Sequence, residues 1–255
     1  MELDLVKMFT VAGTVGARVT GLLMVAPMLG GIAVITRVKI ALALVLTAFL
    51  YPLVTQTVSP SGFVSWTELA LREMAVGLVL GFALQLVFEA AQFAGQVLGV
   101  QMGFSLVNVL DPQTQVDTPV LGIFCQLVTL LIFLQLNVHH WLLRGLARSF
   151  RYIPPGAFQL SRPTIEEVLR ASGSVLLCGV QIAAPALAAT LLADIALGFL
   201  GKASPQLPVL FVGLSVKSVL GLTVLVLIAG AWPRYFEQQF LVAIETSERV
   251  LSLAH

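Results

Sequence analysis

Glu89, Asp194 and Lys217 are charged residues that stand inside long apolar stretches of this chain. A charged group within a bilayer is a candidate for ion or proton handling, because burying it without a partner is expensive. Asp194 and Lys217 lie on either side of the short sequence GKASPQLP. Folding the chain about Ser204 would bring them within about one helical turn of each other. An ion pair inside this hairpin is one prediction, and pairing of each charge with a neighbouring subunit is the alternative.

Glycine, amide and carboxylate side chains form a stripe along the apolar run that starts at Trp66. At 100° per residue they fall within roughly 40° of a common line: Gly81, Gln85, Glu89, Gln92, Gln96, Gly99 and Gly103. In a membrane helix such a stripe faces other helices or water, since glycines permit close approach and amides bond across the contact. Two interpretations stay open: the stripe joins helices, or its part nearest residue 101 borders an aqueous path.

An irregular stretch, QMGFSLVNVLDPQTQVDTP (residues 101–119), separates two apolar runs and belongs to neither. Backbone that leaves a helix within lipid has no water to bond, so it is tolerated only where protein covers it or where it lines an aqueous path. The sequence therefore predicts a loop that lines or blocks a pore. A buried connector packed away from any lumen is the alternative.

The composition is that of an integral membrane protein, because 58% of the residues are hydrophobic and only 11% are charged. A net charge of +1 favours neither nucleic acid nor an acidic substrate as a partner. Both cysteines lie in apolar runs without metal-ligand spacing, so we expect small hydrophobes and no metal site. The sequence contains no Walker motif, HExxH, nucleophile elbow or paired-carboxylate spacing. We therefore expect no enzyme activity and no cofactor.

The apolar runs predict an all-α, membrane-associated fold with long broken helices and helical hairpins. The expected helices cover residues 6–26, 40–58, 66–107, 120–143, 174–200 and 207–232, followed by an amphipathic helix over 234–255. As one helix, the third run would extend on the order of 60 Å, about twice a hydrocarbon core. It either bends or is not a simple bilayer span. The basic residues give conflicting orientations under the positive-inside rule, which also argues against every run crossing lipid.

Four stretches, in order along nearly the whole chain, resemble the export-gate family of bacterial flagella and injectisomes that contains FliR and SctT. They are LLMVAPMLGGIAVITRVKIALAL (22–44), GQVLGVQMGFSLVNVLDPQTQVDTPVLG (95–122), SFRYIPPG (149–156) and LADIALGFLGKASPQLPVLFVGLSVK (192–217). The DPQTQ sequence favours the flagellar branch. Pro208 departs from the family pattern, which often has Asn there.

The resemblance implies a FliP-like helical part over residues 1–170, followed by a FliQ-like hairpin with a C-terminal amphipathic helix over 171–255. It implies one copy in a ring with FliP-like and FliQ-like subunits, in contact with FlhB-like and FlhA-like export proteins and with unfolded flagellar substrates in transit. The expected location is the bacterial inner membrane, in the flagellar basal body, with the complex lifted toward the periplasm. The expected function is a protein-conducting channel without catalysis. A small secondary transporter with a midplane site is the alternative, using Glu89, Asp194 and Lys217.

In this family the loop that matches residues 102–115 projects into the channel as a plug. Carried over by position, the resemblance implies an apolar seal formed by Met102, Phe104, Leu106, Val109 and Leu110. Gly103 would let the chain leave the helix with little steric penalty, and Asp111 and Pro112 would turn it back. The expected intersubunit or intrahairpin polar residues are Gln85, Glu89, Gln92, Gln96, Asp194 and Lys217.

Overall fold

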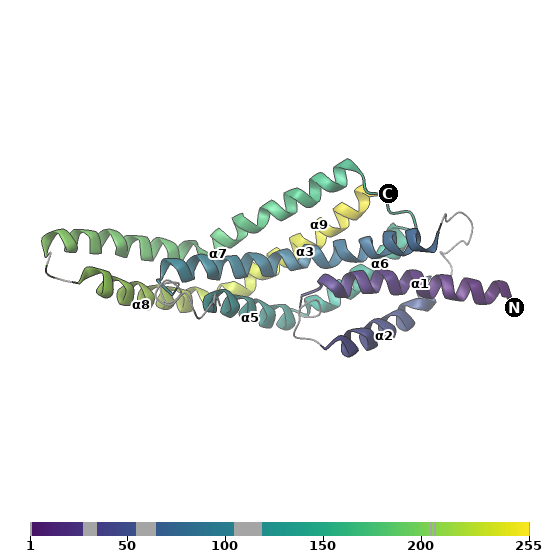
Figure 1. Cartoon of the computed structure of the whole chain (residues 1–255), viewed down its shortest axis with the longest axis horizontal. Helices are drawn as coiled ribbons and strands as arrows, with labels where there is room; N and C mark the ends of the chain where they lie inside the picture. Colours follow the sequence, from purple (N-terminus) through teal and green to yellow (C-terminus); the bar gives the residue numbers. More distant parts are fainter. Residues whose placement is uncertain are drawn as a thin grey trace, which may run out of the picture. The chain divides into compact units, whose positions relative to one another are not determined.

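The computed structural model describes residues 2–27, 35–54, 65–104, 119–204, 206 and 208–254. Every regular element within these residues is an α-helix (Figure 1). The helices are α1 (Glu2–Val25), α2 (Thr36–Val54), α3 (Trp66–Gln101), α5 (Val120–Gln135), α6 (Val138–Tyr152), α7 (Arg162–Ala203), α8 (Val209–Ala229) and α9 (Trp232–Leu253). The all-α fold predicted from the apolar runs is confirmed.

Within the described residues, four helical segments are long and apolar enough to cross a membrane: Met8–Val25, Trp66–Gln101, Arg162–Ala203 and Phe211–Ala229. The pair α5 and α6, taken as one broken span, would be a fifth. α3 contains 36 residues, which at 1.5 Å per residue is about 54 Å, whereas a hydrocarbon core is about 30 Å thick. α3 is therefore one continuous helix that a single bilayer core does not contain.

The chain forms two compact units. The first comprises residues 1–87, 133–173 and 238–255, and its core is built from amphipathic helices. α1 packs against α2 and buries Val11, Val15, Val19 and Leu22, which recur on one helical face. α9 buries Phe240, whose ring meets Phe133 edge-on with centroids 5.5 Å apart. The amphipathic pattern at the end of the sequence thus supplies one apolar face to this unit.

The second unit comprises residues 88–132 and 174–237. α7 and α8 run antiparallel in it (Figure 1), as the sequence predicts for a helical hairpin. α3 and α5 approach closely at Gly95, where an added Cβ would collide with the backbone carbonyl of Leu121. A large side chain at this position would push the two helices apart.

Three predicted boundaries are wrong. The run 66–107 is not helical to its end, because α3 stops at Gln101 and residues 102–104 form a turn. The run 120–143 is not one helix, because α5 ends at Gln135 and α6 starts at Val138 after a bend of 68°. Asn137, between them, has the left-handed values φ 55 and ψ 31, a conformation that Asn tolerates better than most residues. α7 begins well before the predicted position at residue 174, since Ser161 caps it by accepting the Thr164 N–H at 3.3 Å.

Candidate functional site

α3 ends where the predicted plug begins, and its end has a defined backbone geometry. Gly103 has φ 84, and its N–H donates to the Val100 carbonyl at 3.1 Å. The Phe104 N–H donates to the Gly99 carbonyl at 2.9 Å. These two bonds, around a residue in the left-handed region, form a Schellman motif, for which glycine is the usual residue. Phe104, 42% exposed, is the last described residue before the gap.

Met102 is held against α8. Its side chain is fully buried, and its carbonyl accepts a hydrogen bond from the Ser218 hydroxyl at 2.9 Å. An added Cβ at Gly221 would collide with the Met102 side chain. Within this chain Met102 therefore has the surroundings of an anchored residue, while Phe104, two positions later, is open to contact.

Asp194 joins three helices through its two carboxylate oxygens. The Lys217 Nζ lies 2.9 Å from Asp194 Oδ1, and the Gln101 Nε2 donates to Asp194 Oδ2 at 2.9 Å. The first contact is the intrahairpin pair that the sequence offered as one of two alternatives. The second contact, the hydrogen bond between Gln101 and Asp194, was not predicted from the sequence. We call Gln101, Met102, Asp194, Lys217 and Ser218 the anchor cluster.

An apolar groove of about 360 Å³ lies beside Phe104 in the second unit. Its remaining lining residues come from α5, α8 and the start of α9, and all are apolar: Val120, Leu121, Phe124, Val128, Leu222, Leu225, Val226, Ala229 and Trp232. Among the described residues, the wall of this groove carries no charge and, apart from the Trp232 indole, no hydrogen-bonding side chain, so it suits aliphatic and aromatic groups better than a charged substrate.

The remaining plug residues, Leu106, Val109, Leu110, Asp111 and Pro112, lie outside the described residues. Their roles stay predictions.

The polar stripe of α3 does not meet one common neighbour. In the first unit, an added Cβ at Gly81 would lie 2.9 Å from the Leu22 carbonyl of α1. In the second unit, the Gln96 side chain lies beside Gly122 of α5. Gln85 and Gln92 are half-buried and Glu89 is exposed. Part of the stripe thus joins helices within the chain.

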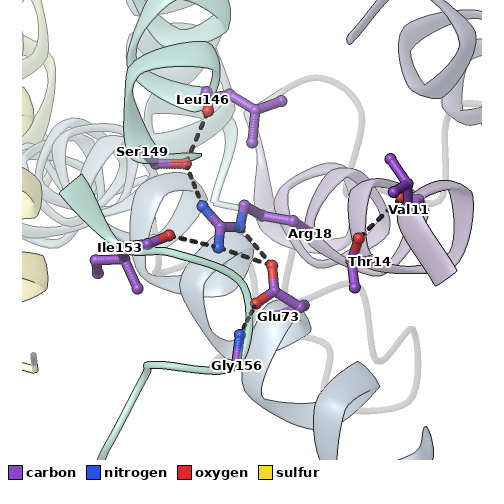
Figure 2. Close-up of polar contacts among 8 residues, drawn as sticks. All are labelled: Val11, Thr14, Arg18, Glu73, Leu146, Ser149, Ile153 and Gly156. Carbon is purple, nitrogen blue, oxygen red and sulfur yellow. Dashed lines mark hydrogen bonds and ion pairs between the residues drawn. The ribbon is translucent and has the colours of Figure 1, made fainter. Parts of the chain in front are cut away.

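A buried ion pair in the first unit escaped the sequence analysis (Figure 2). Arg18 Nη2 lies 2.7 Å from Glu73 Oε2, and both side chains have zero exposure. Arg18 Nε donates to the same oxygen at 2.8 Å. The guanidinium also donates to the Ser149 hydroxyl at 2.9 Å and to the Ile153 carbonyl at 3.2 Å. Its central carbon lies 4.0 Å from the centroid of the Phe150 ring, within the range of a cation–π contact.

The second oxygen of Glu73 accepts the Gly156 N–H at 2.8 Å. The sequence SFRYIPPG, one of the stretches that carry the family resemblance, therefore supplies four of the residues around this pair. Ser149, Ile153 and Gly156 form hydrogen bonds with it (Figure 2), and Phe150 lies against the guanidinium. With both charges matched and hydrogen-bonded, the arrangement fastens α1, α3 and α6 together. It has the properties of a structural site and not of a reactive one.

A signal for this pair was present in the sequence. Arg18 lies inside the first predicted apolar helix, and an intramembrane charge is a functional candidate by default. Its partner Glu73 is 55 positions away, and no short hairpin brings the two together. In the described part of the chain no group of three or more His, Cys, Asp or Glu side chains could hold a metal ion.

The sequence of this chain is similar to those of known bacterial export proteins. Residues 9–242 match the family described as "Bacterial export proteins, family 1". The flagellar biosynthetic protein FliR of Escherichia coli strain K12 is 32% identical over 210 residues, which cover 82% of this chain and 80% of the relative. FliR of Bacillus subtilis strain 168 is 34% identical over 191 residues, covering 72% and 73%. FliR of Pectobacterium carotovorum subsp. carotovorum is 29% identical over 223 residues, covering 88% and 85%.

Proposed function

Because this chain belongs to family 1 of the bacterial export proteins, we propose that it is a subunit of the flagellar export apparatus. In this proposal it forms part of a protein-conducting channel in the inner membrane, within the flagellar basal body. Unfolded flagellar proteins pass through the channel, and other components supply the energy, so this subunit performs no catalysis.

The observation that carries the proposal is the end of α3. The Schellman motif at Gly103 turns the chain out of the helix, and Phe104 is exposed directly after it. The residues that follow are the predicted apolar seal, namely Leu106, Val109 and Leu110 with Phe104. A narrow apolar constriction resists wetting and so blocks ions. Met102 contributes at the base of this plug, and Asp111 with Pro112 turns the chain back.

The proposed partners are FliP-like and FliQ-like subunits in a ring that contains one copy of this chain. Residues 1–170 take the FliP-like role and residues 171–255 take the FliQ-like role. The proposal is supported by exposed apolar side chains on α8, among them Phe211, Val219 and Leu227, which lipid or another helix must cover. In the complex, FlhB-like and FlhA-like proteins are further neighbours, and a lift toward the periplasm accommodates helices longer than the bilayer core.

Deletion of residues 106–110 tests the plug. We expect the deletion to assemble and to let ions leak through the closed gate, because the apolar constriction is gone. The matched control is deletion of residues 113–117, which shortens the same segment by the same length but removes its polar half. The measurement is potassium efflux from cells that carry equal amounts of complex. Unchanged efflux in the 106–110 deletion would remove the plug from this proposal.

Copurification separates the gate from the transporter alternative. A gate subunit should be recovered with FliP-like and FliQ-like proteins, whereas a transporter should purify alone or as a symmetric homo-oligomer. Native mass measurement of the purified material distinguishes these compositions. A stable homo-oligomer without other subunits would contradict the proposed function itself.

A further inference from the structure

We propose that Asp194 is a positioning residue that fixes the end of α3, and with it the point from which the plug segment departs. This inference rests on the proposed function, because it assigns the anchor cluster a task at the same site. Asp194 does not form the seal. It acts through Gln101 and Lys217, which it holds at 2.9 Å each through separate carboxylate oxygens.

The contacts of the anchor cluster restrain the last turn of α3 from two helices. α7 supplies the carboxylate that accepts the Gln101 amide. α8 supplies the Ser218 hydroxyl that donates to the Met102 carbonyl, one of the terminal carbonyls for which a helix has no partner of its own. Since Gln101 and Met102 are adjacent, these bonds restrict both the rotation and the position of the helix end.

The ion pair between Asp194 and Lys217 is only partly buried, so its role in the anchor cluster needs another explanation than burial. Within this chain the Asp194 side chain is 41% exposed and that of Lys217 is 16% exposed, so the two charges do not form a fully buried pair like that of Arg18 and Glu73. The ion pair with Lys217 fixes the orientation of the Asp194 carboxylate. Lys217 occupies Oδ1, which leaves Oδ2 directed at Gln101. The geometry thus favours a role in orientation.

The anchor cluster lies at the end of α3, directly before the residues at which the chain leaves the helix. Gly103 and Phe104 follow the anchored residues directly, and their two backbone bonds define the turn out of α3. A displaced helix end would carry this turn with it. In the proposed function, a shifted departure point would weaken the seal, although the chain and its partners remain assembled.

The test uses the assembled gate and four variants. Asp194→Asn and Lys217→Met break the ion pair, while Gln101→Leu and Ser218→Ala remove the neutral partners. We expect the potassium leak of the closed gate to rise roughly tenfold for Asp194→Asn at unchanged complex abundance, a factor that corresponds to about 1.4 kcal/mol. Two matched controls should stay sealed: Glu166→Gln, which removes an exposed carboxylate from the same helix α7, and Ser215→Ala, whose hydroxyl donates to Phe211 within α8.

The exchanged variant Asp194→Lys with Lys217→Asp should restore part of the seal, because it re-forms a pair between α7 and α8. Wild-type sealing in all four single variants, with a leaking 106–110 deletion, would overturn the positioning role and leave the proposed function standing. If the charge variants do not assemble, Gln101→Leu and Ser218→Ala decide the matter: a leak supports the role and a seal overturns it. A 106–110 deletion that remains sealed would instead overturn the plug.

Discussion

Arg18 and Glu73 are buried together in the first unit, where an unpaired charge would be very costly. Transfer of an ion into a protein interior carries a penalty of several kcal/mol even after relaxation, and the attraction of the pair offsets it only when further hydrogen bonds complete both groups. Here Ser149, Ile153 and Gly156 supply those bonds. Such a pair contributes modestly to net stability, but it selects one arrangement of α1, α3 and α6, since any other strands a charge.

Glu73→Gln should therefore destabilise the first unit by about 3–5 kcal/mol, because Arg18 remains buried without a counter-charge. The matched control is Glu68→Gln, five residues earlier on α3. It breaks the partly exposed pair with Arg72, and we expect a change below about 1 kcal/mol. The measurement is the temperature at which the detergent-solubilised complex loses its resistance to protease. If both variants lost protease resistance at the same temperature, the buried pair of Arg18 and Glu73 would not stabilise the packing of α1, α3 and α6.

The two ion pairs differ in how far the sequence could predict them. Asp194 and Lys217 lie on helices joined by a short link, and folding about that link brings only a few positions together, so the pair could be proposed. Arg18 and Glu73 are separated by the whole of α2. Their contact depends on which faces of α1 and α3 meet, and the apolar pattern of each helix does not determine which other helix covers its buried face.

Helix existence was predictable at the scale of elements, whereas helix ends were not. Long apolar runs specify helices, since only helical backbone satisfies its own polar groups in lipid. The bend at Asn137 depends on one residue in the left-handed region, and no glycine or proline marked it. The start of α7 depends on a serine cap in a stretch whose prolines and charges resemble a loop. The turn at Gly103 was implied by the family resemblance, whereas the apolar run alone placed the helix end at residue 107, six positions after the observed end at Gln101.

The close contact between α1 and α3 requires a glycine at position 77. An added Cβ at Gly77 would collide with the Arg18 carbonyl and lie 2.7 Å from the Leu22 nitrogen, both backbone atoms of α1. Gly77→Ala should therefore destabilise the first unit by about 1–3 kcal/mol, since the helices must move apart. Gly145→Ala is the control, because an added Cβ on α6 meets nothing within 4 Å.

The control should be neutral or stabilising by up to about 1 kcal/mol, the helix propensity that alanine gains over glycine. The two substitutions make the same chemical change with opposite expected signs. Protease resistance of the solubilised complex against temperature measures both. A stabilising Gly77→Ala would contradict the close helix crossing.

At the scale of the whole molecule, the chain leaves much of its apolar surface uncovered. Side chains on α2 such as Leu44, Val45 and Phe49 are more than half exposed, as are Phe211 and Leu227 on α8. A surface of this kind is tolerated only against lipid or another protein. The two coverings differ physically, because lipid chains rearrange around a larger side chain, whereas a packed helix interface does not.

Leu227→Trp distinguishes these coverings. Leu227 is 76% exposed on α8, and an indole is apolar enough for lipid but too large for a closely packed contact. If a FliQ-like or FliP-like helix covers this face, overpacking by about 1–3 kcal/mol should reduce the partner recovered with the chain by roughly tenfold or more. Gln238→Trp, at an exposed position on the polar face of α9, is the control for the indole itself and should leave recovery unchanged. The measurement is the ratio of partner to chain after affinity purification. Full recovery with Leu227→Trp would assign this face to lipid, and the ring would then have to close through other faces of the chain.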